Sequence, residues 1–115
     1  DERGWLFELV KSAQFGQIFV SKTHSGITRG NHYHNSKIEK FCVIQGCGII
    51  RFRLVDSTEV VTYEVNGDEI TIVDIPPGYT HSIENSAAGE TICLFWANAI
   101  YDPVAPDTYF QEVLA

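Results

Sequence analysis

Short runs of apolar and β-branched residues recur along the chain, separated by turn-forming residues every 8–12 positions or so. No segment of useful length shows the 3.6-residue periodicity of an amphipathic helix. The runs predict strands at residues 5–10, 17–21, 39–45, 49–54, 59–65, 70–74, 81–85 and 91–97. The breaks between them contain residues that favour turns, as in Asn66-Gly67-Asp68 and Pro76-Pro77-Gly78. This pattern predicts an all-β sandwich or barrel.

The last predicted strand is apolar on both faces. The run from Ile92 to Ala97 offers no polar side to water, so it must be covered on both sides. One side would pack into the core, whereas the other needs a second sheet or a partner subunit. We therefore expect a homodimer.

Length and composition indicate one folded domain. The chain has 115 residues, with 44% hydrophobic and 12% aromatic residues, which suits an ordered globule with a single core. No apolar run approaches the ~20 residues of a membrane-spanning helix, so we expect no membrane partner. The chain begins at Asp1 without a methionine. We expect a domain cut from a longer chain, although a processed N-terminus would look the same.

Charge is distributed unevenly along the sequence. The formal net charge is −7, and no lysine or arginine follows Arg53. An acidic domain of this kind is a poor candidate for nucleic-acid binding. A local group of bases nevertheless lies between residues 29 and 53, namely Arg29, Lys37, Lys40, Arg51 and Arg53. These side chains would either hold one anionic ligand or be scattered, solvated charges.

The three cysteines, Cys42, Cys47 and Cys93, include no C-x-x-C pair. This number and spacing give little support to a disulfide framework or a cysteine-based zinc site. We expect buried free thiols in a reducing compartment, and hence a cytoplasmic protein.

Two motifs carry the candidate chemistry. The first, from Gly26 to Gly46, reads G-x5-H-x-H-x4-E-x6-G, and the second, from Pro76 to Asn85, reads P-x-G-x2-H-x3-N. In an extended chain His32 and His34 share a face. A hairpin-like return would bring Glu39 back toward them, and a rigid Pro-Pro-Gly turn would aim His81 inward.

Three imidazoles and one carboxylate form a mixed nitrogen and oxygen ligand set. Such a set suits Zn, Fe, Mn, Ni or Co better than Ca or Mg. We therefore predict a divalent transition-metal site at His32, His34, Glu39 and His81, with Zn2+ as the first choice and Fe, Mn or Ni as alternatives. The competing interpretation is that each histidine satisfies its own local contacts. His24 lies outside the pattern, and we expect it at the surface.

The two motifs resemble the signature motifs of the cupin superfamily over about sixty residues, from Gly26 to Asn85. The resemblance implies that residues 1–115 form a single cupin domain, a double-stranded β-helix or jelly roll. One departure concerns a turn: the leading glycine of the second motif would fall at Ile70. Cupin motifs specify the fold and usually a metal, but they say little about the reaction.

A narrower resemblance covers nearly the whole chain. Five stretches look like the C-terminal domain of CapF-type capsular polysaccharide synthesis enzymes: residues 1–4, 28–34, 73–85, 94–98 and 106–109. In that family a reductase domain that uses NADPH precedes a metal-binding cupin. The cupin epimerises C3 of a UDP-linked 4-keto-6-deoxy amino sugar for bacterial capsular or surface polysaccharide. The resemblance implies that this chain is the epimerase half of a bifunctional epimerase and reductase.

The implied reaction suggests roles for several polar residues. Arginines would hold the diphosphate of the nucleotide sugar, with Arg51 and Arg53 as candidates and Arg29 favoured because its guanidinium can bind phosphate bidentately. Tyr79 is a candidate proton donor. Lys37 and Lys40 are candidates for the base or for phosphate contacts. For each of them, the alternative is an ordinary surface residue.

His32 has two possible roles. The stretch from Thr28 to Tyr33 also resembles the R-G-x-H motif of the metal-free rhamnose-pathway 3,5-epimerases, in which the histidine is the general base. A lone pair that binds a metal is not available to a proton, so His32 is either a ligand or a catalytic base. The three further ligands favour the metal. A cupin oxygenase and a non-catalytic sugar-binding module remain the alternative functions.

Overall fold

The computed structural model describes residues 1–114, and within them every side chain except those at positions 7, 9 and 10. This part of the chain contains no helix, and so no helix that is long and apolar enough to cross a membrane. The predicted all-β fold is confirmed. The strands are β1 (Gly4–Ser12), β2 (Gly16–Thr23), β3 (Thr28–Tyr33), β4 (Glu39–Gln45), β5 (Cys47–Leu54), β6 (Val61–Asn66), β7 (Ile72–Ile75), β8 (Tyr79–Asn85), β9 (Thr91–Ala97) and β10 (Tyr109–Phe110).

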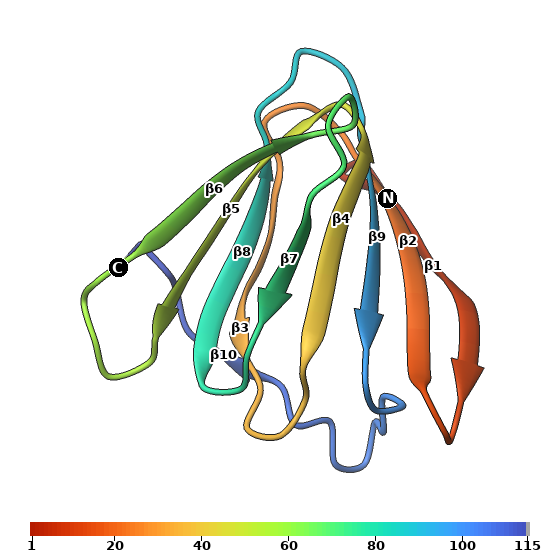
Figure 1. The fold of residues 1–115 in the computed structure, drawn as a ribbon, viewed down its shortest axis with the longest axis vertical. Coiled ribbons are helices and arrows are strands. Elements are labelled where there is room, and N and C mark those ends of the chain that lie inside the picture. Colours follow the sequence, from red (N-terminus) through yellow and green to blue (C-terminus); the bar gives the residue numbers. More distant parts are fainter. Residues whose placement is uncertain (115) are drawn as a thin grey trace.

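The strands form two antiparallel sheets, which Figure 1 shows side by side and converging toward one end. Sheet A has the order β1-β2-β9-β4-β7, and sheet B has the order β10-β3-β8-β5-β6. From β2 to β5, and again from β6 to β9, each strand lies in the sheet opposite to the one before it. This repeated crossing is typical of the jelly roll of the cupins, and it brings residues that are distant in sequence to the same interior.

The core fills the space between the two sheets. Its buried side chains alternate along the strands with outward-facing ones, as the period-two pattern requires. They come from both sheets: Phe41, Val43, Ile50, Phe52, Val65, Val73, Ile75 and Cys93. The partly buried rings of Tyr79 and Phe95 pack against this cluster and extend it toward the motif histidines.

The structure corrects one detail of the predicted ligand geometry. The expected hairpin between the first two ligand segments is wrong, because β3 belongs to sheet B and β4 to sheet A. Glu39 therefore reaches the histidines across the interior of the sandwich and not along a shared sheet. Strand β3 itself was not among the predicted strands, since its sequence Thr-Arg-Gly-Asn-His-Tyr lacks an apolar alternation.

The cysteines follow the prediction only in part. All three are free. Cys93 is buried, whereas Cys42 is half-buried and Cys47 is exposed. Cys47 is the first residue of β5, next to the Gly46 turn, so the apolar residues after it did not imply its own burial.

Candidate metal centre

A bulge in β3 sets the direction of its side chains. The pairing of β3 with β8 shifts register between Gly30 and His32, and both Gly30 (φ 108°) and Asn31 (φ 58°) have left-handed backbones. Arg29 lies opposite Ile83 and His32 opposite His81. Because directly opposite residues share a face, the bulge turns Arg29 and His32 to the same interior face although they are three positions apart.

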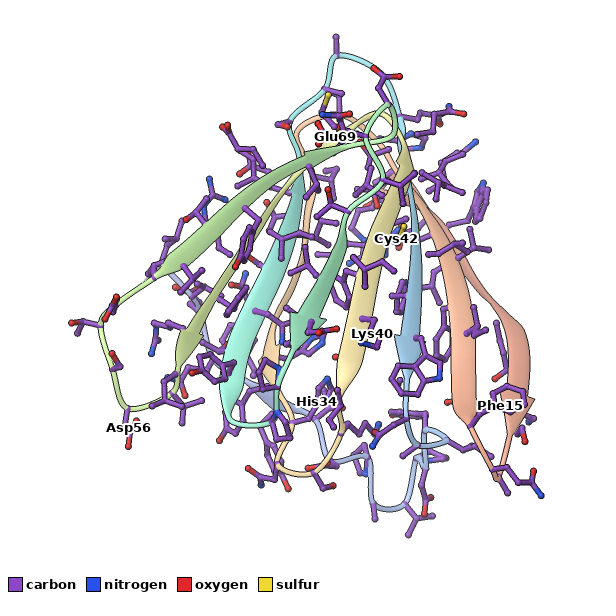
Figure 2. All side chains as sticks on the ribbon, viewed as in Figure 1. Phe15, His34, Lys40, Cys42, Asp56 and Glu69 are labelled. Atoms are coloured by element: carbon purple, nitrogen blue, oxygen red, sulfur yellow. The ribbon has the colours of Figure 1, made fainter. Side chains whose placement is uncertain are left out.

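The other ligand candidates reach the same place from separate segments. Glu39 is the first residue of β4 in sheet A, and its side chain is buried. His81 lies on β8 in sheet B and is 1% exposed. His34 lies in the loop between β3 and β4, near one end of the sandwich (Figure 2).

The donor atoms of the four side chains converge. One atom each from His32, His34, Glu39 and His81 lies within 4.8 Å of all the others. Glu39 Oε1 is 2.5 Å from His34 Nε2 and 3.2 Å from His81 Nε2. The ring of His32 stands edge-on to that of His81, with their centroids 4.7 Å apart.

The far nitrogens of two imidazoles are held by backbone carbonyl groups. Nδ1 of His34 lies 2.7 Å from the carbonyl oxygen of Asp107, and Nδ1 of His81 lies 3.2 Å from that of Tyr79. A carbonyl accepts only a protonated nitrogen, so these contacts place the Nδ1 protons. In both rings Nε2 is then directed at the carboxylate. Hydrogen bonds of this kind orient the histidines of metal sites.

Burial and mutual contact shift the pKa values of this cluster. Burial, followed by repulsion from His81, lowers the pKa of His32 to about 4, so the ring is neutral at pH 7. Burial alone would lower the pKa of His34, but the hydrogen bond and the charge of Glu39 raise it. Burial alone would raise the pKa of Glu39, but the contacts with His34 and His81 lower it to about 2.

The cluster fits a divalent cation. Nε2 of His81 is buried and has no hydrogen-bond partner among the described residues, because its contact with Glu39 lacks hydrogen-bond geometry. A buried, unpaired ring nitrogen is costly unless something binds it. Three nitrogens and one oxygen at this spacing provide the mixed donor set that zinc and its neighbours prefer.

Two cavities open on either side of the cluster. The first has a volume of about 310 Å³ and the second about 500 Å³. Their linings share Leu6, His32, Glu39 and Phe95. The cluster therefore lies between the two cavities, accessible to a ligand that enters either one.

Two of the positively charged residues with predicted roles line these cavities. Arg29 lines the first, where its Nε donates to Thr23 Oγ1 at 2.8 Å. Burial, followed by repulsion from Arg3, lowers the pKa of Arg29. Lys37 lines the second cavity with a side chain that is largely buried, and its Nζ donates to the Pro106 carbonyl oxygen at 3.1 Å.

The remaining predicted residues lie elsewhere, and their roles stay untested predictions. Lys40 pairs with Asp74 at 2.6 Å and is half-exposed on β4, between the buried Glu39 and Phe41 (Figure 2). Tyr79 packs edge-on against the core ring of Phe52, with a centroid distance of 5.7 Å. It does not appear in the lining of either cavity.

Arg51 and Arg53 belong to the outer face of sheet B. They alternate on β5 with the buried Ile50 and Phe52. Arg51 pairs with Glu84 at 2.8 Å. Arg53 donates to backbone carbonyl oxygens of the C-terminal segment and of the β5–β6 turn, at Glu112, Val113, Val55 and Ser57. Of the five bases between residues 29 and 53, only Arg29 and Lys37 therefore line the two cavities.

Among the side chains that line the cavities, sequence reasoning did not single out Arg3 and Tyr101. Arg3 reaches the first cavity from the N-terminal segment. Tyr101 borders the second, and Lys37 Nζ lies 5.2 Å from the centre of its ring. The stretch Asp1-Glu2-Arg3-Gly4 carried part of the family resemblance and was the available signal for Arg3. Tyr101 lies in a segment without a motif.

Comparison with known proteins gives a family match over almost the entire chain. The family model described as "Polysaccharide biosynthesis C-terminal domain" matches residues 1–109. A curated relative from Pseudomonas aeruginosa, UDP-2-acetamido-2,6-beta-L-arabino-hexul-4-ose reductase, is 40% identical over 98% of this chain. The chain spans only 30% of that relative's length.

Solved structures give the same result. The capsular polysaccharide assembling protein CapF from Staphylococcus aureus is 48% identical with a TM-score of 0.97, over 98% of this chain and 33% of CapF. The dTDP-6-deoxy-D-glucose-3,5-epimerase RmlC from Legionella pneumophila has a TM-score of 0.73 at 19% identity, over 86% of this chain and 55% of its own. That second likeness shows the fold alone. The predicted resemblance to CapF-type cupin domains is confirmed.

Proposed function

Because the chain belongs to the family of polysaccharide biosynthesis C-terminal domains, we propose that it is a sugar-nucleotide epimerase domain of polysaccharide synthesis. Its substrate would be a UDP-linked 4-keto-6-deoxy amino sugar, inverted at C3. In the full-length protein a reductase domain that uses NADPH would then reduce the 4-keto group. The observation that carries the proposal is the cluster of His32, His34, Glu39 and His81, which lies between two cavities.

The chemistry requires a stabilised negative charge next to C3. The C3–H proton passes to a base, the C–H electron pair forms a C3–C4 double bond, and the carbonyl π pair moves onto the C4 oxygen. The enolate then collapses back to the ketone as C3 takes a proton on the opposite face. We propose that the four clustered side chains hold a divalent ion, with Zn2+ as the first choice and Fe, Mn or Ni as alternatives. Such an ion would supply Lewis-acid polarisation of a substrate oxygen.

The residues that line the cavities would bind the substrate and move the protons. Arg29 and Arg3 place two guanidinium groups at the first cavity, which suits the diphosphate of the substrate. At the second cavity, Lys37 and Tyr101 are the candidates for proton transfer. If His32 binds the metal, its lone pair is not available as the base, and we therefore favour Lys37 for that role.

Exchange of hydrogen at C3 tests this proposal. The wild-type chain, incubated in D2O with a UDP-4-keto-6-deoxy amino sugar, should incorporate deuterium at C3, measured by NMR. Glu39→Gln should lose this exchange, while Glu84→Gln, which alters a carboxylate paired with Arg51 on the outer face of sheet B, should retain it.

Three other results would contradict the proposal. The first is an absence of exchange across several UDP-4-keto sugars. The second is oxygen uptake by the iron-loaded chain without exchange, which would favour a cupin oxygenase. The third is sugar binding with neither activity, which would favour a binding module.

We further propose that the domain forms a homodimer through the outer face of sheet A. Val20, Leu94, Cys42 and Ile72 lie in one row across four strands of this face, opposite to the side that buries Cys93 in the core. Ile72 is 63% exposed, and the other three are half-buried. An apolar sheet face of this kind favours a second apolar surface over water.

Sedimentation velocity tests the dimer. Leu94→Lys should convert the dimer to a folded monomer, whereas Leu114→Lys, which places the same charge on the exposed C-terminal segment, should leave it a dimer. A wild-type chain that sediments as a monomer at micromolar concentration would contradict the proposed interface.

The free thiols suit a reducing cytoplasm, where we propose that the protein works.

A further inference from the structure

His34 differs from the other three proposed ligands in its position. His32, Glu39 and His81 lie on strands, whereas His34 lies in the loop between the end of β3 and the start of β4. A loop residue has no strand ladder to fix its direction. Its carbonyl oxygen accepts a hydrogen bond from Gly78 N at 2.8 Å, which secures the backbone, and the ring requires a contact of its own.

Asp107 supplies that contact and also holds the loop. Its carbonyl oxygen accepts from His34 Nδ1 at 2.7 Å. Its carboxylate accepts from the next two residues: Oδ1 from Asn35 N at 2.8 Å, and Oδ2 from Ser36 N at 3.0 Å and Ser36 Oγ at 2.6 Å. One residue, 70 positions or so farther along the chain, thus contacts three consecutive residues of the ligand loop.

The segment that carries Asp107 is itself anchored to the same region. The carbonyl oxygen of Pro106 accepts from Lys37 Nζ at 3.1 Å. Tyr109 pairs with Tyr33, and their rings stack with centroids 5.2 Å apart. Asp107 has a left-handed backbone with φ of 49°, a conformation that Asp and Asn tolerate better than most residues. The carboxylate contacts hold the peptide group in the orientation in which its carbonyl reaches His34.

We propose that Asp107 is a positioning residue for the metal centre. Its carboxylate fixes the loop, and its carbonyl accepts the proton of His34 Nδ1, so that Nε2, which faces Glu39 in the cluster, is the nitrogen directed at a bound ion. Ligating histidines in metal sites depend on such a partner for their tautomer and ring orientation. This inference rests on the proposed metal site and extends it to a residue outside the ligand set.

The variant Asp107→Asn tests the inference with almost no change of shape. The carboxylate oxygens accept from two different backbone N–H groups, so an amide in either orientation directs its NH2 at one of those donors. We expect Zn2+ affinity, measured by competition with a chromophoric chelator, to fall about 10–100-fold, the usual effect of losing an outer partner of a metal ligand.

Asp102→Asn is the matched control. Asp102 lies in the same segment, and its Oδ1 accepts only from Val104 N, at 2.9 Å, a role that an amide oxygen can take over. Asp102→Asn removes the same charge as Asp107→Asn, and its Zn2+ affinity should stay at the wild-type value. An equal loss in the two variants would overturn the inference, because general charge would then explain it.

Two further measurements separate positioning from folding. Ser36→Ala removes one of the donors to Asp107 and leaves both backbone contacts, so it should cause a smaller loss of Zn2+ affinity while the metal-free melting temperature stays close to wild type. In the zinc-loaded chain, where Nε2 no longer donates to Glu39, two-bond ¹H–¹⁵N spectra should show the His34 proton on Nδ1 in wild type and a mixture of tautomers in Asp107→Asn.

The outcomes distinguish this inference from the proposed function. Wild-type Zn2+ affinity and an unchanged His34 tautomer in Asp107→Asn would overturn the positioning role and leave the epimerase proposal standing. An absence of C3 exchange in a chain whose Zn2+ affinity depends on Asp107 would contradict the epimerase proposal alone. A wild-type chain without Zn2+ affinity would overturn both the metal site and its positioning residue.

Discussion

Glu39 contacts two of the three histidines in the candidate metal centre. Its Oε1 contacts imidazoles from the β3–β4 loop and from β8, and it comes from the opposite sheet to β8. Its carboxylate is buried and its pKa is lowered to about 2 because contacts with His34 and His81 outweigh its burial. The carboxylate is therefore charged at neutral pH, and it would offset part of the positive charge of a bound ion.

Glu39→Gln removes that charge with little change in volume. We predict that Zn2+ affinity falls more than about 100-fold, beyond the loss of an outer partner, because a neutral amide is a poor ligand for zinc. Isothermal titration with Zn2+ measures this effect. Glu84→Gln is the control, since Glu84 pairs with Arg51 away from the cluster. Unchanged Zn2+ affinity in Glu39→Gln would exclude Glu39 as a ligand.

A second prediction concerns the different reactivities of the Cys47 and Cys93 thiols. Burial raises the pKa of Cys93 to about 12, although a hydrogen bond to the Cys42 backbone opposes this shift. At pH 8 the Cys93 thiol therefore stays protonated, and only the thiolate is nucleophilic. Iodoacetamide should label the exposed Cys47 in the native protein and leave Cys93 unlabelled until denaturation, as measured by peptide mass spectrometry. Labelling of both at similar rates would contradict the described burial.

The grouping of His32, His34, Glu39 and His81 was predictable from sequence because residue identity and spacing indicate it. Paired histidines at i and i+2, a following glutamate and a histidine after Pro-Pro-Gly specify the chemistry before any contact is known. Tyr101 was not predictable as part of the site. Arg3 and Asp107 lie in stretches that carried the family resemblance, but nothing in their local sequence shows which segment they meet. Conversely, Arg51 and Arg53 were predicted to bind substrate as part of the local group of bases in the sequence, but their side chains face outward on β5.

Among the structural elements, the bulge in β3 has the largest effect on the site. A regular strand would direct Arg29 and His32 to opposite faces, because side chains alternate with period two. The left-handed residues Gly30 and Asn31 change this alternation. Asn31 also binds the C-terminal segment, since its carbonyl oxygen accepts from Gln111 N and its Oδ1 from Val113 N.

Gly30→Ala tests the importance of this bulge. A Cβ at Gly30 would lie 2.7 Å from the backbone oxygen of His81, and the φ of 108° is unfavourable for alanine. We predict a loss of about 1–3 kcal/mol in the free energy of unfolding and weaker Zn2+ binding as His81 shifts. Denaturant unfolding measures the first effect. Gly89→Ala, at a position with open space around it, should change neither, and equal stability of the two variants would contradict the strain at Gly30.

The strands show where sequence patterns succeed and fail. Each predicted strand matches an observed one to within two residues at both ends, because apolar alternation and turn residues mark them locally. Strands β3 and β10 escaped prediction: the first is polar and bulged, and the second is two residues long. Both exist through pairing with neighbours distant in sequence, β3 with β8 and β10 with β3.

At the scale of the whole molecule, the cluster joins the two sheets. Glu39 belongs to sheet A, whereas His32 and His81 belong to sheet B. A bound ion would therefore cross-link the sandwich and should stabilise the native state over the unfolded chain. At free Zn2+ near 100 times the dissociation constant, we predict about 2.7 kcal/mol of added stability, seen as a higher melting temperature that a chelator reverses. A zinc-dependent rise in Glu39→Gln equal to that of wild type would contradict this cross-link.

The most direct test of the central claim, a metal held by four side chains from both sheets, is a crystal structure of the zinc-loaded chain with anomalous data collected on both sides of the zinc absorption edge. We predict one strong anomalous peak, about 2.0–2.2 Å from a donor atom of each of His32, His34, Glu39 and His81. A map without a peak at this cluster, or with one that excludes Glu39 and leaves the carboxylate bonded to His34 alone, would contradict the account.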